Sequence, residues 1–261
     1  MKIGVRLVVI ISVFNIIGIG ILAGVTLSLS QKQIYRMAEE NALNLAVQGS
    51  EKIKSWFGVY MDASRTLAQI MEGYKSIPAA ERRGYFDLML KQVLLANPEL
   101  VGVWSGWAPN ALDGMDEHYA NTPGTDSSGR YVPVWGNGAN GLFVEPLAAY
   151  DTSAFYTLPM QTGNEIVLDP YIYPLAGKDI LITSLCIPIK DNGKVVGVVG
   201  VGIELSKIAA IAGEIKPFGD GFTLVFSGGG IVAAHTDPSR IGKDMRQSER
   251  DTFGSFLNTA V

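Results

Sequence analysis

The sequence has few of the residues on which most enzymes and disulfide-stabilised domains depend. Among 261 residues there is a single cysteine, Cys186, and there are two histidines, His118 and His235. One cysteine excludes an intrachain disulfide and a cysteine-rich metal site, and its place in an apolar run indicates a small core residue. Two distant histidines give little from which to build a metal site or a Ser-His-Asp triad. We therefore expect no enzyme, no metal and no cofactor.

The chain also has no excess of positive charge. Its formal net charge is −4, and no cluster of Lys and Arg is interleaved with aromatic residues, so nucleic-acid binding is not predicted. The stretch GNGANG at 136–141 matches the G-x-G-x-x-G pattern of dinucleotide sites. The extended LFVEPL follows it, where a pyrophosphate site requires a helix. With 48% apolar residues, the chain is long enough for one or two globular domains.

Residues 7–29 lack any charged side chain. This segment, LVVIISVFNIIGIGILAGVTLSL, has 23 residues, which as a helix rise about 34 Å, enough to cross the hydrocarbon of a bilayer. Lys2 and Arg6 precede it, so the positive-inside rule predicts that residues 1–6 are cytoplasmic and that the chain after Ser30 is extracytoplasmic. A cleaved signal peptide is the alternative, but its apolar region is usually shorter and ends at a small-residue cleavage site. We expect a transmembrane helix.

Residues 31–74 lack proline and clusters of turn-forming residues, which favours one long extracytoplasmic helix. Apolar side chains recur there at spacings of three, four and seven, as on one face of an amphipathic helix. The face predicted to pack on a domain consists of Leu43, Ala46, Ile53, Phe57, Tyr60, Ala63, Leu67, Ile70 and Met71.

The pattern of residues 75–213 predicts a domain that mixes helices with antiparallel strands. A second helix is expected from Ser76 to about Asn97, followed by strands at 100–107 and 130–135, the second interrupted by Pro133. A short helix is expected to start near Ser153. The segments ILITSLCIPI and KVVGVVGVGIEL flank Asn192-Gly193, which is the signal of a type I′ hairpin. This order favours an α+β fold with antiparallel sheets over a doubly wound parallel fold.

The last part of the chain begins a further unit. SKIAAIAGEI predicts a short helix, and GFTLVF and GIVAAH flank SGGG as a second hairpin. After Gly219 only about 40 residues remain, which are too few for a self-sufficient domain without a disulfide or metal. We therefore expect the sequence to be the N-terminal portion of a longer protein.

Aromatic and charged side chains are concentrated between residues 104 and 179. Small-ligand pockets are mainly apolar and aromatic with a few placed polar groups, and aromatic faces can bind a cation. Packing in the core is the competing explanation for each of these rings. The candidate ligand-binding residues are Trp104, Arg130, Tyr131, Trp135, Tyr150, Asp151, Phe155, Tyr156, Tyr171, Tyr173 and Asp179.

Two segments carry a family resemblance. They are YDTSAFYTLPMQTGNEIVLDPYIYPLAGKDILITSLCIPIKDNGKVVGVVGVGIEL at 150–205 and GFTLVFSGGGIVAAHTDPSRIGKDM at 221–245. Preceded by a membrane span and a long helix, they resemble the double Cache sensory region of bacterial methyl-accepting chemotaxis proteins. The resemblance implies a PAS-like membrane-distal module at 75–213 that binds a small organic molecule, and the start of a membrane-proximal module at 214–261. It further implies an inner-membrane receptor with a periplasmic sensory region, a homodimer, and cytoplasmic signalling partners.

The same resemblance limits the ligand. Family members that bind free amino acids have an R-x-W-Y motif before the distal helix and two aspartates further on. Here Ser153, Phe155 and Tyr156 stand at the motif, and Tyr173 and Gly202 stand where the aspartates are expected. A zwitterionic amino acid would bury two charges without partners, which is costly.

Two ligand classes therefore stay open. One is a small carboxylate bound by Arg130, and the other is an amine or quaternary ammonium bound by the aromatic rings with Asp151 or Asp179. The same sensory region can precede a histidine kinase or a diguanylate cyclase instead of a chemotaxis signalling region. A structural alternative is that the pocket is collapsed and the domain engages a periplasmic binding protein or another partner.

Overall fold

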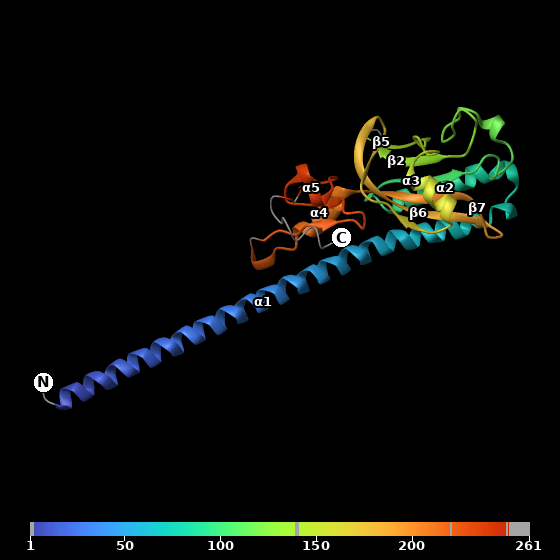
Figure 1. The fold of residues 1–261 in the computed structure, drawn as a ribbon. Helices are drawn as coiled ribbons and strands as arrows, with labels where there is room; N and C mark the ends of the chain where they lie inside the picture. The colour runs from blue at the N-terminus through green and yellow to red at the C-terminus, as the bar shows by residue number, and fades with distance from the viewer. Residues whose placement is uncertain (1–2, 139–140, 220, 249, 251–261) are drawn as a thin grey trace. The chain divides into compact units, whose positions relative to one another are not determined.

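A computed structural model describes residues 3–138, 141–219, 221–248 and 250. The chain divides into two units, Met1–Gln48 and Gly49–Val261. The first helix, α1 (Ile3–Glu72), runs from one unit into the other without a break (Figure 1). The second unit is an antiparallel sheet with helices, so the predicted α+β class is confirmed.

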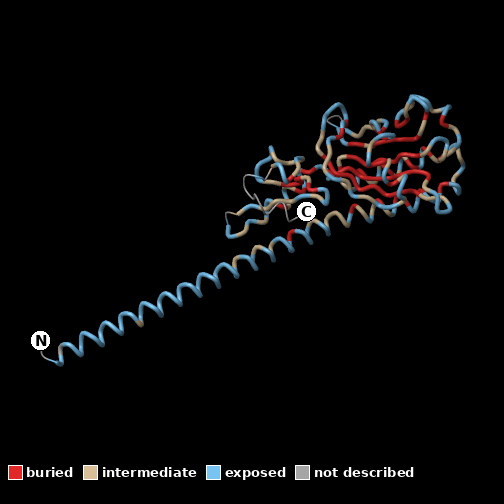
Figure 2. Tube along the Cα trace, in the orientation of Figure 1, coloured by how far each residue is buried: buried red, intermediate tan, exposed pale blue. Residues whose placement is uncertain are grey.

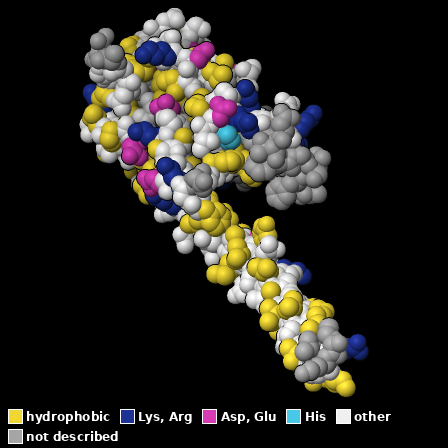
Figure 3. Space-filling model, turned by 90° about the vertical axis from the view of Figure 1, so that its left-hand side faces the viewer, with side chains coloured by type: hydrophobic (Ala, Val, Ile, Leu, Met, Phe, Trp, Pro, Cys, Tyr) yellow, Lys and Arg dark blue, Asp and Glu magenta, His cyan; other side chains and the backbone are white. Residues whose placement is uncertain are grey.

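The first unit consists of the N-terminal part of α1. Among the described residues, one helix is long and apolar enough to cross a membrane, and its most apolar window has a mean hydropathy of 2.6 with 0% buried. Hydrophobic side chains cover the part of this helix that faces the viewer in Figure 3, and the tube of Figure 2 marks it as exposed. An apolar helix surface of this kind is suited to lipid rather than to water.

The connection from α1 to the second helix differs from the prediction. Two 3₁₀ turns, Tyr74–Ser76 and Ala79–Glu81, precede helix α2, which spans Arg82–Ala96. Ile77 and Pro78 have extended backbones with ψ of 136° and 135°. The residue before a proline avoids the helical region, so the α-helix begins later than the predicted Ser76.

Seven strands form the main sheet of the second unit. The sheet has the order β3-β2-β1-β7-β6-β4, with β5 also paired to β6, and the pairs are antiparallel. The bounds are β1 Leu100–Trp107, β2 Pro133–Gly138, β3 Gly141–Pro146, β4 Ile166–Val167, β5 Tyr171–Leu175, β6 Lys178–Asp191 and β7 Lys194–Glu204. The first five residues of LFVEPL belong to strand β3, so this segment is extended, as expected, and is not the helix that a dinucleotide site requires.

Two turns determine the strand pairing on one side of the sheet. Asn192 and Gly193 both have positive φ, 50° and 84°, which confirms the predicted type I′ hairpin between β6 and β7. Ala176 and Gly177 make a similar turn with φ of 50° and 71°. Because of this second turn, Tyr171–Leu175 form a strand paired to β6, which was not among the strands expected from the sequence.

The strand predicted at 130–135 is shifted in the structure. Strand β2 begins only at Pro133, which pairs with Pro146 of β3, and β2 lies between β3 and β1 rather than at the edge. Proline is tolerated at the first residue of a strand, where the missing N–H removes no ladder bond. Arg130 to Val132 therefore belong to the preceding loop.

Helices and connections cover both faces of the sheet, and Figure 2 shows the buried residues concentrated along its strands. One face packs on α1 and α2 through residues that include Tyr60, Leu67, Met71, Phe86 and Leu90. Part of the predicted α1 face is therefore buried, although Ile70 is 46% exposed. Helix α3 (Ala154–Thr162) follows the expected cap Ser153 and packs on the other face.

The C-terminal segment adds a small cluster to the same unit. It contains α4 (Leu205–Gly213), a 3₁₀ turn Pro217–Gly219, β8 (Val225–Phe226), β9 (Val232–Ala234), a 3₁₀ turn Pro238–Arg240 and α5 (Met245–Ser248). Strands β8 and β9 form the second predicted hairpin. Apolar side chains of α4 and β9 pack with Ile53 and Phe57 of α1. The expected module bounds at 213 and 214 stay a prediction.

Candidate functional site

The sheet face away from α1 and α2 encloses a small cavity. Its lining comes from β1, β2, β5, β6, β7, α3 and the loop before α3. The lining residues are Val101, Gly102, Trp104, Val134, Leu147, Phe155, Tyr171, Tyr173, Leu175, Ile182, Ser184 and Gly202. The space open to the centre of a water molecule is about 20 Å³, which is close to what one ordered water requires. A larger ligand therefore requires outward movement of the lining.

Four aromatic rings surround this cavity. The centroid of the Phe155 ring lies 5.2 Å from that of Trp104, 5.8 Å from that of Tyr173 and 6.2 Å from that of Tyr171. The Trp104 and Tyr173 contacts are edge-to-face and the Tyr171 contact is stacked, which are the preferred arrangements of aromatic pairs. The rings come from one helix and two different strands, so the fold brings them together from distant parts of the sequence.

Hydroxyl groups supply the polar atoms of the cavity. The Tyr171 hydroxyl and the Ser184 hydroxyl share a hydrogen bond of 2.7 Å, and the Tyr173 hydroxyl accepts one of 3.1 Å from the Ala148 amide. The Tyr171–Ser184 hydrogen bond uses only one of the two hydroxyl hydrogens of this pair. The Tyr173 hydroxyl accepts its bond and therefore still has its own hydrogen to donate. Within the described part of the chain, these two hydrogens have no acceptor, so they are available to a ligand oxygen.

Both tyrosines remain neutral at physiological pH. Burial raises the pKa of Tyr173 to about 12, and it raises the pKa of Tyr171 further above its usual value near 10. None of the twelve lining residues, which all lie in the described ranges, carries a charge. The cavity is therefore aromatic, uncharged and provided with hydroxyl groups.

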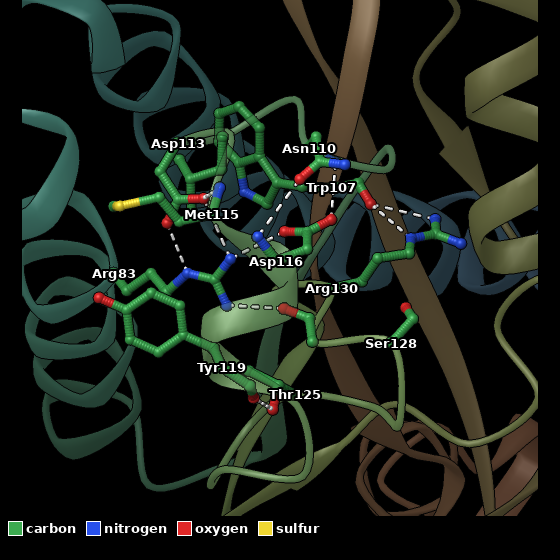
Figure 4. A network of polar contacts seen from close by, with 12 residues as sticks. Arg83, Trp107, Asn110, Asp113, Met115, Asp116, Tyr119, Thr125, Ser128 and Arg130 are labelled. Carbon is green, nitrogen blue, oxygen red and sulfur yellow. Dashed lines mark hydrogen bonds and ion pairs between the residues drawn. The ribbon is translucent and has the colours of Figure 1, made fainter.

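Arg130 does not line the cavity. Its guanidinium donates to the Trp107 carbonyl oxygen from Nε and Nη2 at 3.1 and 3.0 Å, as Figure 4 shows. It also donates to the Tyr156 hydroxyl at 2.9 Å and pairs with Asp151 at 2.8 Å. Four of its five N–H groups are thus used, which leaves little capacity to bind an anion.

Tyr150 and Asp126 complete this Arg130 cluster. The Arg130 guanidinium carbon lies 4.6 Å from the Tyr150 ring centroid, in cation–π geometry. The Tyr150 hydroxyl donates to Asp126 at 2.5 Å. Three candidate residues, Tyr150, Asp151 and Tyr156, therefore surround Arg130 beside the cavity instead of lining it.

Three other candidates lie away from the cavity. Tyr131 and Trp135 are on the opposite face of the sheet, where both donate to Oδ1 of Asp87 on α2 at 3.0 Å. They face α2 because side chains alternate along a strand and Val132 and Val134 take the cavity side. Asp179 is exposed on β6, opposite Pro174 of β5. These three residues were expected to border the pocket, but they do not line this cavity.

Several lining residues were not among the candidate ligand-binding residues. Ser184 and Ile182 face the cavity from β6, and Gly202 does so from β7. The alternation of β6 could have indicated them, because Ile182, Ser184 and Cys186 share one face of that strand. Serine, isoleucine and glycine do not indicate ligand binding by themselves. Their place at the cavity becomes visible only when the pairing of β6 and β7 with the other strands is known.

A buried ion cluster anchors the long loop that leads to Arg130. Arg83 of α2 pairs with Asp113 at 2.6 Å and with Asp116 at 2.8 Å, and it donates to the Gly129 carbonyl oxygen at 2.8 Å (Figure 4). Burial opposes the charge of Asp113, but the hydrogen bonds from Arg83 and from the Met115 amide lower its pKa below 3.8. The cluster holds the loop, and through it Arg130, against α2.

A small aromatic cavity on one face of an antiparallel sheet, with a long helix on the other face, is an arrangement suited to a sensor module. Residues 88–210 match the model of the first PDC sensor domain of methyl-accepting-chemotaxis-protein-like proteins. The methyl-accepting chemotaxis protein TlpQ of Pseudomonas aeruginosa is 32% identical over 201 residues, which are 69% of this chain and 28% of that protein. The chain thus spans less than a third of the length of this relative.

Solved structures agree with this match. The extracellular domain of a protein assigned as a histidine kinase, mmHK1S-Z2, is 31% identical, with a TM-score of 0.75 over 86% of this chain and 82% of that one. The ligand-binding domain of the P. aeruginosa chemoreceptor PctC, solved with GABA, has a TM-score of 0.55 at 18% identity over 79% and 80% of the two chains, and it shares the fold alone. The chain belongs to the Cache, or PDC, family of chemoreceptor-like sensor domains, as its resemblance implied.

Proposed function

We propose that this chain is the extracytoplasmic sensory region of a transmembrane receptor that binds a small organic amine in the aromatic cavity. The observation that carries the proposal is the cavity itself, which four aromatic rings surround and no charged side chain lines. A ligand carboxylate would lose its hydration there without gaining a cationic partner, at a cost of several kcal/mol. A cation would lose its hydration as well, but aromatic rings can attract it, in contacts worth about 0.5–2 kcal/mol each.

The geometry of Arg130 argues against the carboxylate alternative. Its hydrogen bonds to Trp107, Tyr156 and Asp151 already satisfy most of its donors. The hydroxyl groups of Tyr171, Tyr173 and Ser184 at the cavity wall can each donate or accept, so an ammonium group could donate to their oxygens. The relative TlpQ is a chemotaxis protein, which supports a chemotaxis output.

A histidine kinase output is the second candidate. It is favoured by the likeness to mmHK1S-Z2, which reaches 31% identity over 86% of this chain. In a chemotaxis receptor and in a histidine kinase alike, residues 7–29 would cross the inner membrane and the sensory region would lie in the periplasm. Homodimerisation along α1 is part of the same proposal, because Ile34, Met37, Leu43 and Val47 leave apolar surface exposed on that helix.

A thermal-unfolding experiment on the full chain in lipid nanodiscs tests the ligand class. The probes are tetramethylammonium, butylamine, propionate and alanine. At 100-fold excess over Kd, a bound ligand raises the midpoint by about 5–10 °C, and we expect such a rise with the two cations. A larger rise with propionate or alanine would contradict the proposal.

A matched pair of variants ties the response to the cavity. Trp104→Phe shrinks a ring that lines it, whereas Trp135→Phe makes the same change on the opposite face of the sheet. We expect the first variant to weaken binding of the responding cation by about 3–10-fold and the second to leave it unchanged. Equal losses in the two variants would remove the cavity from the site.

A further inference from the structure

The segment that carries Tyr171 into the cavity is also in contact with the C-terminal hairpin. We name residues Leu168 to Tyr171 the strap. Its Leu168 amide donates to the Ser184 carbonyl oxygen at 3.0 Å, and its Leu168 carbonyl oxygen accepts from the Thr183 hydroxyl at 2.6 Å. The strap is thus attached to β6 at its first residue. At its last residue it is attached by the backbone pairing of Tyr171 with Ile182 and by the Tyr171–Ser184 hydroxyl pair.

Asp169 points from the strap to the β8–β9 turn. Its Oδ1 accepts a hydrogen bond of 3.2 Å from the Gly229 amide. A Cβ on Gly229 would lie 2.1 Å from Asp169 Oδ2, so the carboxylate approaches this backbone as closely as only a glycine permits. One residue, Pro170, separates Asp169 from Tyr171 at the cavity wall, and the proline ring restricts the backbone between them.

The hairpin that receives this contact packs on the membrane helix. Ala233 and Ala234 of β9 share a core cluster with Ile53 and Phe57 of α1 and with α4. The turn itself is tied internally, because the Gly230 amide donates to the Ser227 carbonyl oxygen at 2.9 Å. A displacement at Gly229 therefore moves the hairpin as a unit.

Space for such a displacement is present under the strap. A second cavity, with about 240 Å³ open to water centres, lies between Leu168–Pro170 on one side and Val225–Gly228 on the other, with Ile53 and Phe57 at its wall. Its walls are mostly apolar, and nothing in them selects a ligand. It does allow the strap and the hairpin to shift without a steric clash.

We propose that the Asp169–Gly229 contact is a latch that couples the state of the aromatic cavity to the β8–β9 hairpin and, through it, to α1. When the Tyr171 side chain is displaced from Ser184, the strap keeps the backbone pairing of Tyr171 with Ile182 but loses its side-chain attachment to β6, and Asp169 shifts with it. The hairpin then loses its contact with the strap. The role of the latch in signalling rests on the proposed function, in which the cavity is the ligand site. The coupling itself is a property of the chain without any ligand.

Hydrogen exchange of the full chain in nanodiscs, followed by mass spectrometry, tests the latch in a double-mutant cycle. Ser184→Ala removes the partner of Tyr171, and Asp169→Ala removes the latch. We expect Ser184→Ala to raise exchange in peptides covering residues 225–234 by a few-fold to about tenfold. We expect no further rise from Ser184→Ala when Asp169 is already Ala. No ligand is added, so the result is independent of the proposed amine.

Two controls keep the outcome decisive. Asp179→Ala removes a carboxylate from the exposed end of β6 and is expected to leave exchange at 225–234 unchanged. Gly229→Ala breaks the same contact from the hairpin side and should reproduce the effect of Asp169→Ala, with folding checked by the thermal midpoint. If Ser184→Ala leaves the hairpin unchanged, or acts equally when Asp169 is Ala, the latch does not exist.

Discussion

The Trp104 indole packs against the backbone of Gly200 so closely that no other residue fits at this position. A Cβ on Gly200 would lie 2.5 Å from Cζ2 of Trp104 and 2.5 Å from the Leu185 carbonyl oxygen. We therefore expect Gly200→Ala to lower the free energy of unfolding by about 1–3 kcal/mol, because the indole or the strand must shift. Urea unfolding of the full chain measures this loss.

Gly202, two residues further along β7, provides the matched substitution. A Cβ there would meet Cδ1 of Ile182 at 3.5 Å, an ordinary contact, and it would enter the aromatic cavity. We expect Gly202→Ala to change stability by less than about 1 kcal/mol and to weaken ligand binding. Equal destabilisation by the two alanines would contradict this assignment of roles.

Arg130 is expected to act as a structural residue. Arg130→Met removes the donors to the Trp107 carbonyl oxygen and the Tyr156 hydroxyl, and it leaves these buried acceptors unpaired. The expected loss is about 2–4 kcal/mol of unfolding free energy. Asp151→Asn is the control: the Asp151 side chain is 63% exposed, so this change should cost under about 1 kcal/mol. A stable Arg130→Met protein that had lost only an anion response would restore the carboxylate hypothesis.

The Arg83 cluster is expected to be the more sensitive ion site. Arg83→Met leaves Asp113 and Asp116, with side chains 0% and 8% exposed, without their cation. Breaking a buried ion pair in this way costs about 3–5 kcal/mol. Replacing both aspartates by asparagine in the Arg83→Met protein should recover part of the loss. If Arg83→Met has the stability of the parent, measured by urea unfolding, the cluster does not hold the loop.

Acid is expected to destabilise the loop around Asp126. Burial opposes its charge, but hydrogen bonds from the Tyr150 and Ser128 hydroxyls lower its pKa below 3.8 in the folded state. A carboxyl group with a lowered pKa contributes stability above its unfolded pKa and loses it as the pH falls through the folded value. Stability should therefore fall below about pH 4. Asp126→Asn, which keeps an acceptor but does not titrate, should flatten this part of the profile between pH 4 and pH 2.5.

The sequence predicted the elements whose signals are local. Asn192-Gly193 fixed the β6–β7 hairpin, and the proline-free stretch after Ser30 gave the long helix. The Tyr171–Leu175 strand was missed because its turn places Ala176 at positive φ, where alanine gives no turn signal.

Which face of the sheet each side chain points to could not be predicted from local signals. Tyr131 and Trp135 alternate with Val132 and Val134, and both sets are apolar, so either could have faced the cavity. Only the contact of Tyr131 and Trp135 with Asp87 on α2 decides between them. Trp104, Phe155, Tyr171 and Tyr173 were among the candidates because aromatic content marks both a core and a pocket, and here the rings serve as both.

Under the proposed function, the narrowness of the aromatic cavity would set the concentration range over which the receptor responds. With about 20 Å³ open to water centres, the rings themselves occupy the space that the proposed amine would need, so its binding would require a minor, opened state. An opening cost of about 1.4 kcal/mol makes the apparent Kd tenfold larger than the intrinsic one. Substitutions that loosen the strap, without touching the ligand, would then shift the response threshold to lower concentrations.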